Sequence, residues 1–585
     1  MIALNQVSRD RHSRGTADST YWMSSVTNRA GRRTCTMTAV NVISPNGKTS
    51  PADIHRVMAQ SAGSSTWAPL RYKMFRWLWL ASLVSNVGTW MQTVGAQWLL
   101  VHAAHAAILV SLVQTADMLP DVLFAVVGGV LADTLDRRRL LIAVQTGLAL
   151  AGAALAALTF AGQMSPALLL IFTFVIGSGS VFITPAYQSL VSELVPVDDV
   201  RSAVQLNSIN VNIARAVGPA LAGVVVASLG VGADFALNAG TFLIYAIVVV
   251  LWRPSTNITH PHPERFMSAL RAGGRYVRYA PVVRRILLRA ALFLVPASAL
   301  WGLLPLVASR RLGLGPSGYG LLLGALGIGA IGGVAVISRV RARLSSNGLV
   351  GLASGVFGVA LVVVALLHST IGVVLVLLPT GMTWVWMLAT LNTSLQLFLP
   401  AWVRARGLSI YQMVLFGAQG VGALLWGVVA DTLGLTVAFL VSAGLLGAGA
   451  ASMRLWPLFE TSHMDRSIVT RPDPEFPLEL APDAGPVVVW TTYTIAPEKE
   501  SEFTSAMHRV RESRLRTGAT EWGLFRNGEQ PGVFEEIFFV ASLDEHLRQH
   551  RERLTSDDRA FEDAAKALST TPTRTWHLLP TDVED

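Results

Sequence analysis

Long apolar segments separated by short polar turns dominate the chain between residues 75 and 456. A helix needs about 20 apolar residues to cross a bilayer, and this part of the chain divides into twelve segments of that kind. The pattern therefore predicts twelve transmembrane helices. They are expected at residues 75–101, 107–132, 140–161, 167–191, 203–228, 234–252, 290–308, 318–338, 348–367, 371–399, 407–430 and 436–456.

A repeat with a spacing of 204 residues divides the apolar region into two halves. The run that begins at Gly128 recurs at Gly332, and Pro196 recurs at Pro400. A repeat of this length in a hydrophobic chain is typical of transporters built from two related bundles. We therefore expect an all-α membrane protein with twelve transmembrane helices in two six-helix pseudo-symmetric halves. Further pairs at this spacing are Arg137 and Arg341, Arg139 and Arg343, Gly218 and Gly422, Gly223 and Gly427, and Gly230 and Gly434.

The pattern changes after Trp456, where the chain becomes rich in Pro, Asp and Glu and then alternates short strands with amphipathic helices. The order βαββαβ predicts a small α+β ferredoxin-like C-terminal domain. Its second helix is expected at 543–568. The expected domains are a disordered basic N-terminal tail (1–70), a first six-helix bundle (71–252), a cytoplasmic central loop (253–289), a second six-helix bundle (290–456), a linker (457–485) and the ferredoxin-like domain (486–580).

Arginine is concentrated on one side of the predicted membrane region. The loops that follow even-numbered helices contain seventeen Arg, whereas the loops that follow odd-numbered helices contain only Arg310 and Arg311. Because positive residues stay on the cytoplasmic side of a membrane, this asymmetry predicts cytoplasmic N- and C-termini. The expected location is a multi-pass protein of the bacterial plasma (inner) membrane.

Composition narrows the function classes. The chain has 585 residues, 52% of them hydrophobic and only 14% charged, with a net charge of +9. The excess positive charge follows from the basic tail and the arginine-rich loops, so no nucleic-acid partner is predicted. Cys35 is the only cysteine, which excludes an intrachain disulfide. The sequence contains no P-loop or dinucleotide-binding glycine run, so no cofactor is predicted.

The loop after the second predicted helix carries an ordered motif. It runs from Gly129 through Asp133 and Asp136 to Arg137 and Arg138. This resembles the signature between helices 2 and 3 of the major facilitator superfamily, in which the element latches one conformation of the transport cycle. In the second half Ile337 stands where the motif has its aspartate, so the latch is expected to be asymmetric. A cluster of positive charges without a latch is the alternative.

Two carboxylates lie within the second predicted helix. Asp117 and Asp121 are four residues apart and share a helix face. A charge near the bilayer centre costs about 2.5–3.5 kcal/mol, and the pair suits a proton-coupling site. Arg215 in the fifth helix is the candidate partner. Two alternatives stay open: the carboxylates meet water near the extracellular entrance, or they form a purely structural ion pair.

Other polar and aromatic residues within the predicted spans are candidates for a substrate cavity. Polar side chains avoid lipid and face a cavity or another helix, while tryptophans at a membrane interface explain some aromatic positions equally well. The candidates are Asn86, Trp90, Gln92, Asn207, Asn210, Trp384, Asn392 and Gln412.

Residues 71–456 resemble the subgroup of the major facilitator superfamily that includes the enterobactin exporter and related transmembrane secretion effectors. The run Phe75-Arg76-Trp77-Leu78-Trp79 and the loop around Asp133 carry this resemblance. It implies a proton-coupled exporter of a siderophore, drug or secondary metabolite that works by alternating access. The partial helix 5 motif around Pro219 also favours export. A proton-coupled uptake symporter is the alternative, because direction does not follow from folding physics.

The tail resembles antibiotic-biosynthesis-monooxygenase-like dimeric α/β barrels. This similarity rests on Arg514, Gly518, Trp522 and Glu535, followed by His546 and His550. It implies a possible homodimer through the C-terminal domain. An enzymatic tail is the weaker alternative, because no catalytic set is evident. The two histidines have a spacing found in zinc sites, but no third ligand is evident, so no metal is predicted. The expected partners are a small-molecule substrate, protons and the lipid bilayer.

Overall fold

The computed structural model describes residues 23–27, 33–37, 67–252, 266–459, 465–474, 476, 481 and 483–580. The side chains of 23–27, 33–37, 126, 129, 130, 132–134, 192 and 266–272 are not described. Residues 1–65 and 66–585 form two separate compact units.

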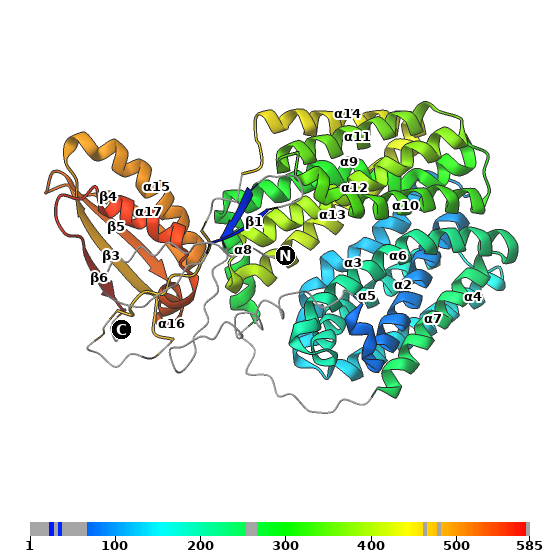
Figure 1. Cartoon of the computed structure of the whole chain (residues 1–585), viewed down its shortest axis with the longest axis horizontal. Helices are drawn as coiled ribbons and strands as arrows, with labels where there is room; N and C mark the ends of the chain where they lie inside the picture. The colour runs from blue at the N-terminus through cyan, green and yellow to red at the C-terminus, as the bar shows by residue number, and fades with distance from the viewer. Residues whose placement is uncertain are drawn as a thin grey trace, which may run out of the picture. The chain divides into compact units, whose positions relative to one another are not determined.

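Within the described ranges, twelve long helices form two sets of six (Figure 1). Eleven of them are long and apolar enough to cross a membrane. The other one, α2, is 27 residues long and packs against α6 and α7. The predicted all-α membrane fold is confirmed. The first set is α2 (Lys73–Leu99), α3 (Ala106–Thr134), α4 (Arg137–Phe160), α5 (Pro166–Leu194), α6 (Val197–Leu229) and α7 (Val231–Leu251). The second set is α9 (Pro281–Leu306), α10 (Pro316–Arg341), α11 (Ser346–Leu366), α12 (Thr370–Phe398), α13 (Ala401–Leu433) and α14 (Leu435–Ala451).

The internal repeat is visible in the backbone. Helices α12 and α13 begin and end 204 residues after α5 and α6. Pro196 and Pro400 precede α6 and α13 with φ of −57° and −58°. Gly230 and Gly434 end the same helices with φ of +83° and +93°, a conformation that residues with a side chain rarely adopt. The glycines and prolines of the repeat therefore set the same turns in both halves.

The halves meet along two related interfaces. Helix α3 packs against α13, and α6 packs against α10. Because α10 and α13 are the repeat counterparts of α3 and α6, the two interfaces are related by the pseudo-symmetry. Positions that decide access between the halves are therefore expected along these four helices.

The described parts of the N-terminal region differ from the predicted disordered tail over 1–70. Strands β1 (Met23–Thr27) and β2 (Arg33–Met37) pair antiparallel. A short helix, η1 (Ala68–Arg71), precedes α2, and Arg71 donates a 2.7 Å hydrogen bond to Asp199 at the start of α6. Arg71 thus links the segment that precedes α2 to α6 of the first half.

The central loop is shorter than the predicted 253–289. Helix α8 (Phe266–Tyr279) is followed at once by α9, which starts at Pro281 rather than near residue 290. Arg289 is buried in α9, and its guanidinium donates to the carbonyl oxygens of Gly449 (2.9 Å) and Ser452 (3.0 Å) at the end of α14. The unpaired carbonyls of a helix end stabilise a positive charge. This pairing lets the helix continue through an arginine-rich segment.

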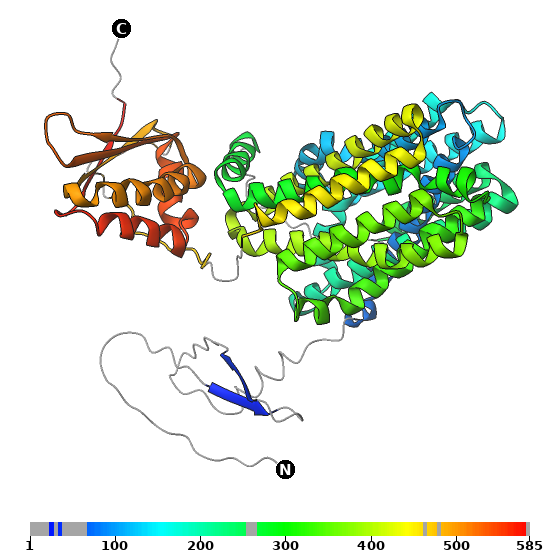
Figure 2. The same ribbon diagram turned by 90° about the horizontal axis from the view of Figure 1, so that it is seen from above.

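The C-terminal domain has the predicted βαββαβ order. A four-stranded antiparallel sheet has the order β4-β5-β3-β6, and Trp490 lies opposite both Ile537 and Trp576. Helices α15 and α17 cover one face (Figure 2). The strands and helices are β3 (Val487–Thr494), α15 (Glu500–Thr517), β4 (Ala519–Arg526), β5 (Val533–Val540), α16 (Leu543–Arg548), α17 (Ser556–Lys566) and β6 (Arg574–Leu578), with the short helices η4 (Pro497–Lys499) and η5 (Gln549–Arg553).

The single helix expected over 543–568 is interrupted in the structure. Thr555 caps α17, since its hydroxyl accepts from the Asp558 amide while the Asp558 carboxylate accepts from the Thr555 amide. Such a reciprocal capping box starts a new helix. The prediction of one continuous helix is therefore wrong.

Candidate functional site

One face of α6 is exposed at its N-terminal end and buried at its C-terminal end. Residues spaced by three or four share a helix face, and the face in question runs through Arg215. Val204 on this face is 58% exposed, whereas Ala222 is fully buried. The exposed positions are Val204, Ser208 and Val211, and the buried positions are Pro219, Ala222 and Val226.

The matching face of α13 shows the same change. Gln412 is exposed, while Ala423, Trp426 and Ala430 further along the helix are buried. Gln419 occupies the position that Arg215 holds in the first half. The halves are thus apart at the end where α6 and α13 begin, which we call the open end. They are in contact at the end where α6 and α13 finish, which we call the closed end.

Glycines bring the backbones together at the closed end. A Cβ atom placed on Gly320 of α10 would lie 2.6 Å from the carbonyl oxygen of Pro219 and 3.1 Å from the Cα of Gly223. At the related interface, a Cβ on Gly427 would lie 2.7 Å from the Cβ of Ser111. Small residues permit such close helix packing. The closed end is therefore sealed by backbone contact along both interfaces.

Polar contacts join the same end of the two halves. The Nδ1 atom of His105, before α3, lies 2.7 Å from an Oδ2 of Asp431 near the end of α13. Gln97 of α2 donates to the carbonyl oxygen of Trp301 (3.4 Å) and accepts a hydrogen bond from the Tyr319 hydroxyl. These contacts were not anticipated from the sequence, because each pairs residues that are far apart along the chain.

Aromatic side chains from both halves meet beside Arg215. Its guanidinium carbon lies 5.5 Å from the ring centre of Trp90 on α2. The Trp90 and Trp301 ring centres are 6.2 Å apart, and those of Trp301 and Trp384 are 5.4 Å apart. Helices α2 and α6 belong to the first half, and α9 and α12 to the second. The centre of the molecule therefore combines one cation with a row of three indole rings.

Asp117 and Asp121 are half-buried on α3, on the side away from its most exposed residues. Leu119 and Leu123 point the other way and are exposed, as expected for a lipid-facing surface. No ion pair within 4.0 Å joins Arg215 to either carboxylate among the described residues. The predicted partnership of these three residues is therefore not made in this conformation.

The candidate latch residues make contacts within the first half. The Asp136 carboxylate caps α4 by accepting from the Arg139 amide (2.7 Å), and Arg137 pairs with Glu193 at the end of α5. Arg138 donates to the carbonyl of Val250 at the end of α7 (2.7 Å). Gly129 and Asp133 lie in α3, but the surroundings of Gly129 and the side chain of Asp133 are outside the described part of the structure. The described part of the motif thus organises the open end of one half.

Several substrate-cavity candidates pack inside the first half. Asn86 donates to Asn210 (2.9 Å), and Asn210 donates to the carbonyl of Trp79 (3.0 Å). Gln92 accepts from Asn238 of α7 (2.6 Å) and is buried. Satisfied polar groups of this kind stabilise helix packing. Asn86, Asn210 and Gln92 therefore contact neighbouring helices of their own half.

The remaining candidates differ in their surroundings. Trp384 is buried against Phe293 and Phe357 as well as Trp301. Asn392 accepts from Gln396 on its own helix. Asn207 is half-buried in α6, and Gln412 is exposed at the open end. Of the eight predicted cavity residues, Trp90 and Trp384 are the two that the ring contacts bring together around the centre.

Asp234 is an acidic residue that the sequence interpretation missed. It is fully buried in the first turn of α7, and neither carboxylate oxygen has a hydrogen-bond partner among the described residues. A Cβ on Gly95 of α2 would clash with one of these oxygens, so α2 and α7 pack closely here. Its position at the edge of a predicted span hid it, although a search for acids within the spans would have found it.

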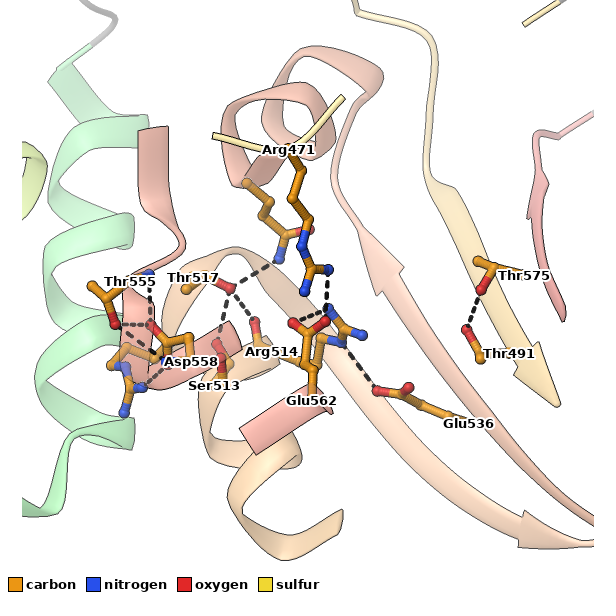
Figure 3. A network of polar contacts seen from close by, with 12 residues as sticks. Arg471, Thr491, Ser513, Arg514, Thr517, Glu536, Thr555, Asp558, Glu562 and Thr575 are labelled. Carbon is orange, nitrogen blue, oxygen red and sulfur yellow. Dashed lines mark hydrogen bonds and ion pairs between the residues drawn. The ribbon is translucent and has the colours of Figure 1, made fainter. Parts of the chain in front are cut away.

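A buried ion-pair network fills the C-terminal domain between sheet and helices (Figure 3). Arg514 donates to Glu536 (3.1 Å) and Glu562 (2.8 Å), and Arg471 also pairs with Glu562 (2.6 Å). The Tyr493 hydroxyl and the Trp522 indole N–H also donate hydrogen bonds to the Glu536 carboxylate. Burial alone would lower the pKa of Arg514, but the two carboxylates raise it above its ordinary value. These internal pairs indicate a structural role.

Three histidines of this domain lie in contact with one another. The ring centre of His546 is 4.8 Å from that of His550 and 4.9 Å from that of His577. Burial, together with the neighbouring His550 and His577, lowers the pKa of His546 to about 3. No group of His, Cys, Asp or Glu in the described ranges has the arrangement of a metal site. The histidines therefore pack as neutral rings.

Two six-helix halves that meet along α3–α13 and α6–α10, apart at one end and sealed at the other, define a membrane transporter of the major facilitator type. Residues 64–582 match the family model described as "Transmembrane secretion effector". The chain belongs to this family, whose match extends through the C-terminal domain. Its family and its relatives are transporters and not enzymes.

Characterised relatives cover the membrane region. The chain is 26% identical over 370 residues to the staphyloferrin A transporter of Staphylococcus aureus, which covers 63% of this chain and 92% of that protein. It is 25% identical over 379 residues to the multidrug efflux pump Tap of Mycolicibacterium fortuitum, with coverage of 62% and 90%.

Solved structures share the fold. A mutant of the nucleoside transporter NupG has a TM-score of 0.56 at 13% identity, over 66% of this chain and 100% of that one. A bacterial homolog of the human lysosomal transporter Spinster, inward-facing and occupied, has a TM-score of 0.54 at 15% identity, with coverage of 67% and 97%.

Proposed function

We propose that this protein is a proton-coupled exporter of a siderophore, drug or other secondary metabolite that works by alternating access. The observation that carries the proposal is a central site placed between an open end and a closed end, with two carboxylates on the interior side of α3. The names of the relatives, a staphyloferrin A transporter and a multidrug efflux pump, support the substrate range and the outward direction.

The arginine distribution supports the orientation. The open end is bordered by the arginine-rich loops, including Arg137, Arg138 and Arg341. By the positive-inside rule this end faces the cytoplasm, together with both chain termini. In this orientation the conformation is open to the cytoplasm and ready to receive a substrate for export.

In the cycle that we propose, proton entry drives the change from the outward-open state back to the state that is open at the cytoplasmic end. Protonation of Asp117 or Asp121 removes a charge that is costly inside the membrane. A substrate bound at the centre contacts both halves. The Asp133 and Arg137 region is proposed to hold the two halves together at the cytoplasmic end in the outward-open state. In the present state Arg137 pairs with Glu193 and Arg138 donates to the Val250 carbonyl, both within the first half.

Everted membrane vesicles test this function. The probes are ethidium, erythromycin and 2-naphthoate, each added to vesicles with an acidified lumen. We expect at least one probe to release protons from wild-type vesicles. Asp117→Asn or Asp121→Asn should lower that rate at least tenfold, because an amide cannot carry the proton. The exposed Asp198→Asn, outside the interior, serves as the control.

Two outcomes would change the proposal. Unchanged proton release in both variants would remove Asp117 and Asp121 from the mechanism, and loss of release in Asp234→Asn would place coupling at the buried acid of α7 instead. Accumulation of a probe in right-side-out vesicles, but not in everted ones, would establish uptake as the direction of transport.

We further propose a second copy of this chain as the partner of the sheet face of the C-terminal domain that lies opposite α15 and α17. Phe525, Trp576 and Leu578 are exposed there, and Trp490 contacts Trp576 on the same face. Exposed aromatic patches commonly mark protein interfaces. The mass of the detergent-solubilised chain measures this directly: two chains per particle are expected, and one chain would contradict the proposal.

A further inference from the structure

Arg215 is a charged residue without an ionic partner, among the described residues, in the middle of a transmembrane helix. It is the nineteenth of the 33 residues of α6, at the boundary between the exposed and buried parts of its face. Its Nε atom is buried and has no hydrogen-bond acceptor, and no carboxylate of the described residues lies within 4.0 Å. A charge at this depth costs about 2.5–3.5 kcal/mol, so its presence requires an explanation.

Trp301 supplies a second unused donor from the other half. Its indole Nε1 is buried and also lacks an acceptor among the described residues. Both groups lie close to Trp90, with the Arg215 guanidinium 5.5 Å and the Trp301 ring 6.2 Å from its ring centre. A buried donor without a partner costs about 1–3 kcal/mol. Two such donors around the same Trp90 ring therefore favour a ligand that brings acceptor oxygens.

The surroundings define the rest of such a ligand. Trp90, Trp301 and Trp384 offer three ring faces or edges in a row, and apolar flat groups pack well against indole rings. A guanidinium binds a carboxylate through two parallel N–H donors. Gln419, at the pseudo-symmetric position, is neutral and donates to the Leu415 carbonyl of its own helix. The cation is therefore present at this position in only one half.

We propose that Arg215 and Trp301 bind an anionic group of the transported molecule, a carboxylate or similar oxyanion, while the row of tryptophans packs against its flat apolar body. This inference rests on the proposed transport function and adds the substrate class. Because Arg215 and Trp301 lie in different halves, one anion contacts both halves at once. Asp117 and Asp121 do not neutralise Arg215 in this conformation, so the charge remains available to the ligand.

A matched pair of probes tests the charge requirement. 2-Naphthoate and its neutral amide, 2-naphthamide, share one flat body and differ in the anionic group. In titrations of the full purified chain in detergent, wild type should bind naphthoate at least tenfold more tightly than naphthamide. Arg215→Gln should remove this preference, and Trp301→Phe, which keeps an aromatic ring but lacks the N–H, should reduce it severalfold. Arg339→Gln, an exposed arginine at the end of α10, should leave it unchanged.

The outcomes separate this proposal from the transport function. Equal binding of the two probes to wild type, or an intact preference in Arg215→Gln, would overturn the anion site. Loss of the preference in Asp117→Asn or Asp121→Asn, with Arg215→Gln unaffected, would also overturn it. Thermal unfolding of each variant identifies misfolded protein. If Arg215→Gln is misfolded, Arg215→Lys replaces it, and this variant should keep part of the preference for naphthoate over naphthamide. Naphthoate binding without proton-linked flux of any probe would refute proton coupling and leave the anion site standing.

Discussion

Replacing Gly320 with leucine is expected to force the closed end of the transporter apart. Even a Cβ atom at this position lies 2.6 Å from the Pro219 carbonyl oxygen, a backbone atom that cannot rotate away. A leucine side chain therefore requires α6 and α10 to separate, since overpacking a tight contact costs about 1–3 kcal/mol or more. The result is a shift of the population toward states open at that end.

Cysteine labelling measures this shift. With Cys35→Ser as the background, the chain has no other cysteine. Ala423→Cys introduces a thiol at a fully buried position of α13 near the closed end. We expect a membrane-impermeant maleimide added from outside the cell to label this thiol at least tenfold faster when Gly320→Leu is present. Gly355→Leu, where a Cβ meets open space, is the control. Equal labelling rates would show that the Gly320 contact does not seal the closed end.

Replacing Arg514 with methionine is expected to destabilise the C-terminal domain severely. The change leaves Glu536 and Glu562 buried after losing the cation they share, although Arg471 still reaches Glu562. Breaking a buried ion pair by removing one partner costs about 3–5 kcal/mol, because the remaining charge is uncompensated. Since whole domains are only about 5–15 kcal/mol stable, the tail should unfold at a much lower temperature.

Limited proteolysis of the full chain during a temperature ramp follows the tail separately from the membrane helices. Arg526→Met is the matched control, because Arg526 pairs with Glu500 at the surface and is 62% exposed. Exposed pairs contribute little to stability, so this variant should behave like wild type. If the tail of Arg514→Met became susceptible to the protease at the same temperature as that of the control, the network of Figure 3 would be dispensable for folding.

The repeat could be predicted from the sequence because proline and glycine mark the starts and ends of its helices. Pro196 and Gly230, with Pro400 and Gly434, set the helix ends through backbone geometry that depends on local residues alone. The start of α9 was misjudged for the opposite reason. Arg289 is tolerated inside the fold because distant carbonyls at the end of α14 accept its hydrogen bonds, and no local pattern reveals such partners.

The same limit explains the candidate site. Polarity correctly marked Asn210 and Gln92 as residues that avoid lipid. It could not show that their partners, Trp79 and Asn238, belong to the same half. Trp90 and Arg215 come together because Gly218 lets α6 approach α2 at that point. Pairings such as Gln97 with Tyr319 depend on how the two halves dock, which the hydrophobic period of a single helix does not encode.

Cross-linking the closed end tests alternating access most directly. In the Cys35→Ser background, His105→Cys and Asp431→Cys place two thiols where the native side chains are 2.7 Å apart. A short bis-methanethiosulfonate linker should join them, stop transport in everted vesicles and leave Ser208→Cys at the open end accessible. Reductant should restore transport. Full transport by quantitatively cross-linked protein would contradict alternation between the two ends.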